Sequence, residues 1–276
     1  MDDFRIFTSI RYDPGLLKLS SLGFTNIGWN QDASPFYMLD FHRDRMLRAA
    51  VHWNWTAAIA TISGEEGLKN LQSFLQSITS EADSRPHRVM ITLDADGSLG
   101  HQISPLPETH LNNLYPEYLP SPSPTPEAAD HARDCKVPIK DPTYDILLDD
   151  QKTTKSEFTH HKTTLRGVYN GARKRARINP GDKKEVLLVN DDGHIMEGSI
   201  STPYFWRNGQ WVTPPVSKEF AASQGSGGND GTTRRWALER NLVIEQVVRS
   251  DSLVNGEECW ISNGLRGFIS GKVKLH

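Results

Sequence analysis

The N-terminal part of the chain changes between two hydrophobic patterns, one typical of strands and one typical of helices. Short runs of β-branched and aromatic residues end at turn signals such as Asp13-Pro14-Gly15 and Asp94-Ala95-Asp96-Gly97, which predicts strands. Between them, apolar residues recur every three or four positions, with Asp40 as the expected N-cap of the first helix. The expected elements are strands at 4–11, 88–93 and 98–103 and helices at 39–53 and 65–78. This pattern predicts an α+β unit.

The C-terminal part is richer in strand patterns. Asp191-Asp192-Gly193 and Asn208-Gly209 each separate two short apolar runs, which predicts a β-hairpin at each position. The segment after Lys162 is expected to form an amphipathic helix, with Lys162 at its mouth. The apolar face of this helix consists of Leu165, Tyr169, Ala172 and Ala176. The other expected elements are a helix at 232–240 and strands at 135–139, 144–148, 185–190, 194–201, 204–207, 211–213, 242–249, 258–262 and 268–275.

Prolines interrupt residues 115–126 at close intervals. Because each proline lacks an N–H and fixes its own φ, this segment cannot form a helix or a central strand. We therefore expect an interdomain linker at 115–130. It separates an N-terminal α+β domain at 1–114 from a C-terminal domain at 131–276.

Composition narrows the class of protein. The chain has 276 residues and a net charge of -3, which fits two medium domains and argues against a nucleic-acid binder. Its two cysteines, Cys135 and Cys259, provide no disulfide framework and fit a reducing compartment. No apolar window reaches the length of a membrane span. The expectation is a soluble, cytoplasmic protein without a membrane partner.

Three positions suit chemistry, and each has two interpretations. Lys162 is either a solvated surface charge or a lysine that forms a Schiff base. Glu197, in a small and apolar setting, lies either on the solvated face of a hairpin or beside a ring nitrogen whose protonated form it favours. The glycine-rich loop before Thr232 and Thr233 is either an ordinary helix start or a phosphate cradle, since free N–H groups at a helix N-terminus bind anions.

Other motifs are absent or ambiguous. The sequence contains no His-Glu-x-x-His, Gly-x-Ser-x-Gly or Walker pattern, so we expect no metal site and no serine hydrolase. The two glycines in Ser262-Asn263-Gly264-Leu265-Arg266-Gly267 fit either close backbone approach to a ligand or a tight bend. Four features thus remain: Lys162, Glu197, the phosphate cradle before Thr232, and Arg45 on the helix expected at 39–53. Together they point to a phosphorylated aldehyde cofactor.

Four motifs in this order resemble the fold-type IV pyridoxal-phosphate enzymes, the class IV aminotransferase family, over nearly the whole chain. Phe41-His42-Arg43-Asp44-Arg45-Met46 looks like the His-x-x-Arg-Leu helix of the family, which implies that Arg45 holds the cofactor phosphate. Lys162 matches the lysine that binds the cofactor covalently. Glu197-Gly198-Ser199-Ile200-Ser201 matches the Glu-x-Ser-x-Ser segment that binds the pyridine nitrogen, and Gly231-Thr232-Thr233-Arg234 is similar to the Gly-Ile-Thr-Arg phosphate turn. The implied pyridoxal-phosphate ligands are Arg45, Lys162, Glu197, Ser201, Gly231, Thr232, Thr233, Asn263 and Gly264.

Within this family, three segments are similar to those of 4-amino-4-deoxychorismate lyases. They are Phe7-Thr8-Ser9-Ile10-Arg11, His161-Lys162-Thr163-Thr164 and the Asn-x-Leu-Arg-Gly segment at 263–267. The resemblance implies conversion of 4-amino-4-deoxychorismate to 4-aminobenzoate and pyruvate, a step of folate biosynthesis. It also implies a homodimer of two-domain α+β subunits, each with a small N-terminal α/β sandwich domain and a larger C-terminal domain with a β-barrel-like core.

The resemblance further implies roles at the substrate. Lys162 removes the proton on the amine-bearing carbon, and either Lys162 or the Thr8 hydroxyl protonates the departing fragment. The two substrate carboxylates need cations, although a structural or surface ion pair is an equal interpretation for each arginine. The candidate substrate-binding residues are Arg11, Arg166, Tyr169 and Arg266.

The chain departs from the family pattern at two places, and two other functions remain open. Thr202 followed by Pro203 replaces the usual asparagine, and the loop at 223–230 is longer than expected.

An aminotransferase of the same fold, acting on D-amino acids, branched-chain amino acids or amines, would use the same cofactor residues. A non-catalytic phosphate-binding module would need only the glycine-rich turn.

Overall fold

The computed structural model describes residues 4–24, 28–30, 32–80, 84–122 and 136–275. The chain packs as two compact units. The first comprises Met1–Glu108 and His161–Leu165, and the second comprises Thr109–His160 and Arg166–His276. The first unit thus ends six residues before the expected limit at 114, and it also takes in the short segment that carries Lys162.

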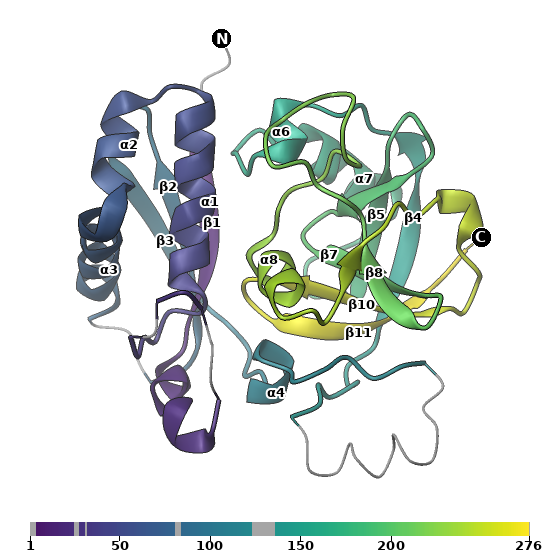
Figure 1. Cartoon of the computed structure of the whole chain (residues 1–276), viewed down its shortest axis with the longest axis horizontal. Helices are drawn as coiled ribbons and strands as arrows, with labels where there is room; N and C mark the ends of the chain where they lie inside the picture. The colour runs from purple at the N-terminus through teal and green to yellow at the C-terminus, as the bar shows by residue number, and fades with distance from the viewer. Residues whose placement is uncertain (1–3, 25–27, 31, 81–83, 123–135, 276) are drawn as a thin grey trace. The chain divides into compact units, whose positions relative to one another are not determined.

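The first unit is a three-stranded antiparallel sheet covered on one face by three helices (Figure 1). Its strands, in the order β1-β2-β3, are β1 (Ile6–Tyr12), β2 (His87–Leu93) and β3 (Leu99–Pro105). Its helices are α1 (Leu39–His52), α2 (Thr56–Ile62) and α3 (Gly64–Thr79), and two short 3-10 turns, η1 (Pro14–Lys18) and η2 (Ser20–Leu22), follow β1. The predicted α+β unit is confirmed.

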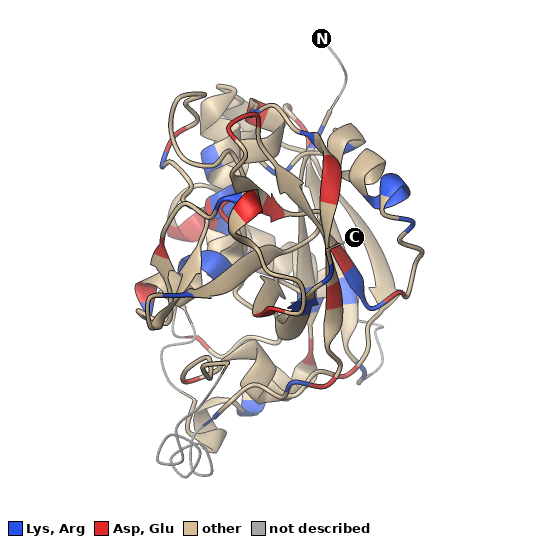
Figure 2. Cartoon of the chain, turned by 90° about the vertical axis from the view of Figure 1, so that its right-hand side faces the viewer, with Lys and Arg blue, Asp and Glu red and all other residues tan. Residues whose placement is uncertain are grey.

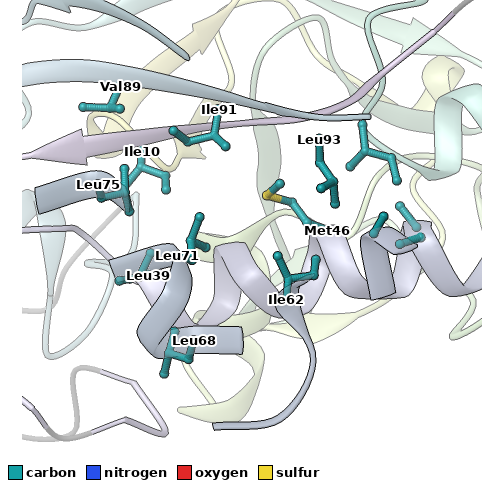
Figure 3. Packing of buried hydrophobic residues seen from close by; sticks show 14 of the residues in the cluster. Ile10, Leu39, Met46, Ile62, Leu68, Leu71, Leu75, Val89, Ile91 and Leu93 are labelled. Atoms are coloured by element: carbon teal, nitrogen blue, oxygen red, sulfur yellow. The ribbon is translucent and has the colours of Figure 1, made fainter. Parts of the chain in front are cut away.

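The core of the first unit lies between the sheet and the helices (Figure 3). Alternate residues of the strands, such as Ile10 and Ile91, point towards Met46 of α1 and Leu71 of α3, and all four are almost completely buried. Burial of one such side chain stabilises the fold by about 1.5–3 kcal/mol relative to exposure. The apolar residues that recur with helical periodicity and those that alternate along the strands therefore pack together in one core.

The segment around Lys162 pairs with the edge of this sheet. Phe7 N–H donates to the Lys162 carbonyl at 3.0 Å, and Thr164 N–H donates to the Arg5 carbonyl at 2.9 Å, so the segment runs antiparallel to β1. Lys162 therefore lies in an extended segment rather than at the mouth of a helix. The predicted helix follows five residues later, as α7 (Gly167–Arg175).

The second unit is built on an eight-stranded, curled mixed sheet (Figure 1). Its strands are β4 (Tyr144–Lys152), β5 (Lys184–Val189), β6 (Ile195–Gly198), β7 (Thr202–Arg207), β8 (Gln210–Thr213), β9 (Ile244–Glu245), β10 (Glu258–Asn263) and β11 (Gly267–Val273), in the order β6-β5-β4-β11-β10-β7-β8-β9. Its helices are α4 (Leu111–Leu114), α6 (Glu157–His160), α7 and α8 (Thr232–Glu239), with a 3-10 turn η3 (Ser250–Ser252). Parallel pairs join β4 to β5, β4 to β11 and β8 to β9.

Strand β5 is buried on both faces, which explains its continuous apolar run. Leu187 joins the main core of the sheet, whereas Val186 and Leu188 pack with Tyr169 and Ala172 of α7. Tyr169, Ala172 and Ala176 of the predicted apolar face thus cover one side of β5, whereas the inclusion of Leu165 is wrong, because Leu165 precedes α7 and belongs to the first unit. Both predicted hairpins, β5-β6 and β7-β8, are confirmed.

Several predicted elements are wrong in detail. Asp40 is not the N-cap of α1: Met38 occupies that position with φ 51°, and the Asp40 carboxylate accepts the N–H groups of Asn30 and Phe41 instead. Helix α2 was not predicted from the sequence. Residues 136–139 form no strand, because Ile139 exchanges its backbone hydrogen bonds with the Asn113 side chain.

The remaining differences lie near the ends of the second unit. Of the strand expected at 242–249, only Ile244–Glu245 pairs with β8. The described part of the linker, 115–122, has no helix or strand, and 123–130 lies outside the described residues, as does Cys135. Cys259 is buried, which raises the pKa of its thiol and makes it unreactive.

Charges are mixed by sign on the described chain. Figure 2 shows basic and acidic residues interspersed along strands, helices and loops. This distribution agrees with the small net charge of -3. In the described residues, no helix is long and apolar enough to cross a membrane.

Gly267 is expected to be required for the turn between β10 and β11. Its φ is +63°, and a Cβ at this position would lie 2.0 Å from the Asn113 carbonyl oxygen, which is backbone and cannot move aside. Gly181 has φ +90° with open space around it. We expect Gly181→Ala to cost about 1 kcal/mol and Gly267→Ala about 3 kcal/mol or more. Thermal unfolding measures both, and equal melting temperatures for the two variants would contradict the predicted steric conflict.

Candidate functional site

Strand β1 and helix α1 bring three polar side chains together inside the first unit. Thr8 follows Ile6 and precedes Ile10 on the core face of β1, and His42 and Arg45 lie one turn apart on α1. The Thr8 Oγ1 lies 2.6 Å from the His42 Nδ1, and the Arg45 Nη2 donates to the same oxygen at 2.6 Å. Thr8 and His42 are fully buried. Because a buried polar group is costly without a partner, these hydrogen bonds hold the three side chains as one network.

His42 is held neutral by its surroundings. Burial lowers the pKa of the imidazole well below its ordinary value, and the charges of Arg45 and Lys162 lower it further. Removing a cation from water costs more than removing a neutral ring, and two neighbouring cations add repulsion.

Lys162 is positioned by its backbone pairing with β1. Its ammonium lies over the Phe7 ring, 4.7 Å from the centroid, which is a cation–π contact. On the preceding residue, the His161 ring packs 4.4 Å from the ring of His52 and 5.0 Å from that of Trp53. The lysine is therefore placed by contacts on both sides of the segment, and it is half-buried rather than on a solvated surface.

In the second unit, the Glu197 carboxylate is engaged by α7. The Tyr169 hydroxyl donates to Glu197 Oε1 at 2.6 Å, and both residues are buried. Burial and the Glu197 charge raise the pKa of Tyr169 well above its ordinary value, so the phenol keeps its proton and remains a donor. Glu197 is thus a buried, oriented carboxylate, and the interpretation as a solvated hairpin residue is wrong.

A second buried glutamate, Glu185 at the start of β5, shapes the bend that follows Glu197. Its carboxylate accepts the Ser199 N–H at 3.1 Å, the Ser199 hydroxyl at 2.5 Å, the Ile200 N–H at 3.2 Å and the Ser201 hydroxyl at 2.6 Å. A Cβ at Gly198 would lie 2.6 Å from the Ser201 Oγ, so the bend needs glycine there. Glu185 was not among the residues predicted from the sequence. The available signal was a glutamate at the start of an otherwise apolar strand.

Two arginines of the α7 region also hold this bend. Arg166 Nη2 donates to the Ser199 carbonyl at 2.6 Å, and its guanidinium stacks 4.6 Å from the Tyr169 ring centroid. Arg173 Nη1 donates to the Ser199 hydroxyl at 3.0 Å. Helix α7 and its N-terminal flank therefore contact two positions of the Glu-x-Ser-x-Ser segment, Glu197 through Tyr169 and Ser199 through Arg166 and Arg173.

The start of α8 has the features of an anion site. Gly231 is its N-cap with extended backbone and no side-chain cap, and a Cβ there would lie 2.9 Å from the Thr202 Oγ1. The Thr232 hydroxyl is buried and makes no hydrogen bond with any described residue. The Thr233 hydroxyl lies 2.6 Å from the Ser262 Oγ. An unpaired buried hydroxyl beside the positive end of a helix fits the phosphate of the implied cofactor.

The candidate substrate residues have different surroundings. Arg11 is fully buried, where its guanidinium pairs with Asp13 at 2.8 Å and donates to the Pro107 carbonyl at 3.1 Å. Tyr169 and Arg166 make the contacts described above. Arg266 is half-buried on the turn after β10, where its N–H donates to the Asn263 side chain at 3.0 Å. The roles of these residues at a substrate stay predictions.

The segment that contains these glycines forms a tight turn. Asn263 Oδ1 also accepts the Leu265 N–H at 3.0 Å, which closes the turn that contains Gly264. Gly267 allows the chain to pass next to the Asn113 carbonyl.

Among the described residues, no group of three or more His, Cys, Asp or Glu could hold a metal ion.

His42 is expected to make stability depend on pH. Its pKa in the folded chain lies below the unfolded value of about 6.5, so at lower pH the unfolded chain binds a proton that the folded chain does not. The contribution of the neutral His42 imidazole to the free energy of unfolding is therefore fully present above about pH 6.5. It is lost as pH falls towards the folded pKa, by at most about 2 kcal/mol at pH 5. Replacing His42→Asn should flatten this fall in melting temperature between pH 7 and pH 5, whereas the control His101→Asn, on the exposed face of β3, should not. Identical slopes for wild type and both variants would contradict the buried neutral imidazole.

Glu185→Gln should destabilise the second unit. The amide keeps one acceptor oxygen and loses the charge and the other acceptor, so hydrogen bonds from Ser199 and Ser201 are weakened, at a cost of about 1.5–3 kcal/mol. The matched control is Glu258→Gln, an exposed carboxylate paired with Lys140, which should change stability by less than about 0.5 kcal/mol. Urea unfolding compares the two, and a Glu185→Gln effect no larger than that of the control would refute the structural role of this carboxylate.

Comparison with known proteins supports the family suggested by these motifs. Residues 24–272 match the family described as "Amino-transferase class IV". A protein of Schizosaccharomyces pombe named "Putative aminodeoxychorismate lyase" is 32% identical over 133 residues, which are 46% of this chain and 54% of that protein. The aminodeoxychorismate lyase of Saccharomyces cerevisiae is 29% identical over 143 residues, 48% of this chain and 37% of that protein. The matched region thus spans about half or less of the length of these relatives.

Solved structures agree with the fold. A hypothetical aminotransferase from Mycobacterium tuberculosis, in its PLP-bound form, has a TM-score of 0.58 and 14% identity over 98% of this chain and 81% of its own. At this identity the likeness shows the fold alone. The family match covers nine-tenths of the chain, so the prediction of family and fold class is confirmed. The chain therefore belongs to the amino-transferase class IV family, the pyridoxal-phosphate-dependent enzymes of fold-type IV.

Proposed function

We propose that this enzyme is an aminodeoxychorismate lyase, which converts 4-amino-4-deoxychorismate to 4-aminobenzoate and pyruvate. The observation that supports this most directly is that the two matched yeast relatives carry that name. The segments His161-Lys162-Thr163-Thr164 and 263–267, which resemble those of the lyases, support the same choice within the family. The reaction would place the enzyme in folate biosynthesis.

The cofactor is pyridoxal phosphate, and its ligands are assigned by motif and supported by local geometry. By motif, Lys162 would hold it covalently, and the Glu197 carboxylate, which accepts a hydrogen bond from Tyr169, would favour the protonated form of its ring nitrogen. The family motifs assign Arg45 and the start of α8 each to the phosphate, and the unpaired buried hydroxyl of Thr232 supports the second assignment. The other assigned contacts come from Ser201, Gly231, Thr233, Asn263 and Gly264. Bound pyridoxal phosphate supplies an electron sink that stabilises negative charge on the amine-bearing carbon of the substrate.

The chain supplies the proton transfers. Lys162 would act as the general base that removes the proton from the amine-bearing carbon of the substrate. The enolpyruvate group then leaves, and the ring becomes aromatic, which drives the reaction. A proton returns to the departing fragment from Lys162 or from the Thr8 hydroxyl. The Tyr169 hydroxyl holds the Glu197 carboxylate in place by donating a hydrogen bond to its Oε1.

Cations are needed for the two carboxylates of the substrate. Of the three candidates, Arg11 and Arg166 already have partners within their own units, Asp13 for the first and the Ser199 carbonyl for the second. Arg266, half-buried on the β10-β11 turn, is therefore the strongest candidate. Arg11 and Arg166 then act mainly by holding the local structure.

The second candidate is an aminotransferase of the same fold. It would use the same fold and the same cofactor residues, and structural neighbours named as aminotransferase and transaminase share this fold over nearly the whole chain. Purified protein given 4-amino-4-deoxychorismate should release 4-aminobenzoate. If it instead transfers amino groups from D-alanine or branched-chain amino acids to a keto acid, the aminotransferase is the correct assignment.

Assembly is also part of the proposal. Sites of this family are built at a dimer interface, so we expect a homodimer in solution. Light scattering coupled to size-exclusion chromatography measures the mass, and a monomer with full activity would exclude this state. The cytoplasmic location stays a prediction.

Lys162→Ala should abolish the covalent attachment of the cofactor. The wild-type protein is expected to be yellow, and borohydride should fix the cofactor on the peptide that contains Lys162. The variant should lose both properties and release 4-aminobenzoate at least about 10³-fold more slowly. The control is Lys174→Ala, an exposed lysine of α7, which should behave as wild type. A Lys162→Ala variant that keeps both colour and product release would disprove the assignment.

A further inference from the structure

We propose that His42 is a positioning residue for Thr8: its Nδ1 accepts the Thr8 hydrogen and so fixes the direction of the hydroxyl beside Arg45. This inference rests on the proposed function for its catalytic consequence. The hydrogen-bond arrangement itself stands on the geometry of the first unit alone.

The first step concerns which atom donates. The Arg45 guanidinium can only donate, so the Thr8 oxygen accepts its N–H at 2.6 Å. The same Nη2 lies 3.4 Å from the His42 Nδ1, so that ring nitrogen also faces a donor. A lone pair on Nδ1 suits this position, whereas an N–H would point towards a cation. The single hydrogen of the Thr8 hydroxyl therefore lies on the 2.6 Å line to Nδ1.

The second step concerns the other ring nitrogen. Burial and the charges of Arg45 and Lys162 keep the imidazole neutral, and a neutral ring carries one N–H. With Nδ1 accepting, that hydrogen is on Nε2, which is buried and makes no hydrogen bond with any described residue. A phenylalanine or leucine would fill this part of the core without such a cost. Stability alone therefore does not explain why position 42 is a histidine, whereas the need to hold the Thr8 hydroxyl does.

The consequence lies in the properties of the Thr8 hydroxyl. Its oxygen receives a hydrogen bond from a cation, which makes the hydroxyl a stronger acid, and its hydrogen has one defined position. Without His42 the hydroxyl would rotate between positions, and the Arg45 guanidinium would lose a fixed acceptor. His42 thus links the group assigned to proton transfer with the group assigned to the cofactor phosphate.

The test begins with the ring nitrogens of the holoenzyme. Labelling with ¹⁵N-histidine and recording NMR spectra shows which nitrogen of His42 carries hydrogen, with His42→Asn identifying the signal. We expect an unprotonated Nδ1 whose resonance shifts in Thr8→Val. A protonated Nδ1, or a resonance that does not respond to Thr8→Val, overturns the proposal whatever reaction the enzyme catalyses.

Kinetics then test the positioning role. His42→Leu removes the acceptor and should lower kcat about tenfold, with KM and cofactor binding changed less than about twofold. His42→Asn places an amide oxygen near the position of Nδ1 and should restore most of the rate. In the double variant with Thr8→Val, the loss should be close to that of Thr8→Val alone. The control His101→Asn should match wild type.

Two outcomes overturn this role: losses in the double variant that multiply, or equal losses for His42→Leu and His42→Asn. If His42→Leu fails to fold, the NMR result and the pair Thr8→Val and His42→Asn decide the question. If wild-type enzyme releases no 4-aminobenzoate, the proposed function fails, while the NMR result still decides whether His42 holds Thr8.

Discussion

The backbone pairing between β1 and the segment at 161–165 is the constraint on which the candidate site depends. Two hydrogen bonds, from Phe7 to Lys162 and from Thr164 to Arg5, attach a segment from the middle of the chain to the N-terminal sheet. Residues on either side of this segment belong to the second unit. The position of Lys162 is therefore set by strand pairing across more than 150 residues of sequence. A flexible surface lysine has no such restraint.

Each unit contains a buried polar network that carries a structural cost and an organising role. In the first unit, Thr8 interrupts the apolar face of β1 and is matched by His42 and Arg45. In the second, Glu185 accepts four hydrogen bonds from the bend after Glu197. Hydrogen bonds between buried polar groups favour one geometry, because breaking them leaves a buried donor or acceptor unpaired. The two networks therefore position the residues whose motifs define the family.

Local patterns predicted most of the elements, and the exceptions have specific causes. The period of α1 and α3 and the turn signals of the two hairpins were sufficient, since these features arise from neighbouring residues. Asp40 has the chemistry of an N-cap, yet it bonds the loop that precedes the helix. The apolar run near Ile139 looks like a strand, yet the Asn113 side chain takes its backbone hydrogen bonds. In both cases a partner distant in sequence decided the outcome.

The same division applies to the site. The sequence by itself determined the family and named Lys162, Glu197 and the turn before α8, because motif spacing is a local property that the family shares. Only the tertiary structure decided that Lys162 lies in an extended segment beside β1 and that the Tyr169 hydroxyl donates to Glu197. It also decided that Glu185 accepts hydrogen bonds from the bend after Glu197. These facts depend on strand register and on which helix covers which strand. Register follows from the burial of one face over the whole sheet, so no single motif contains it.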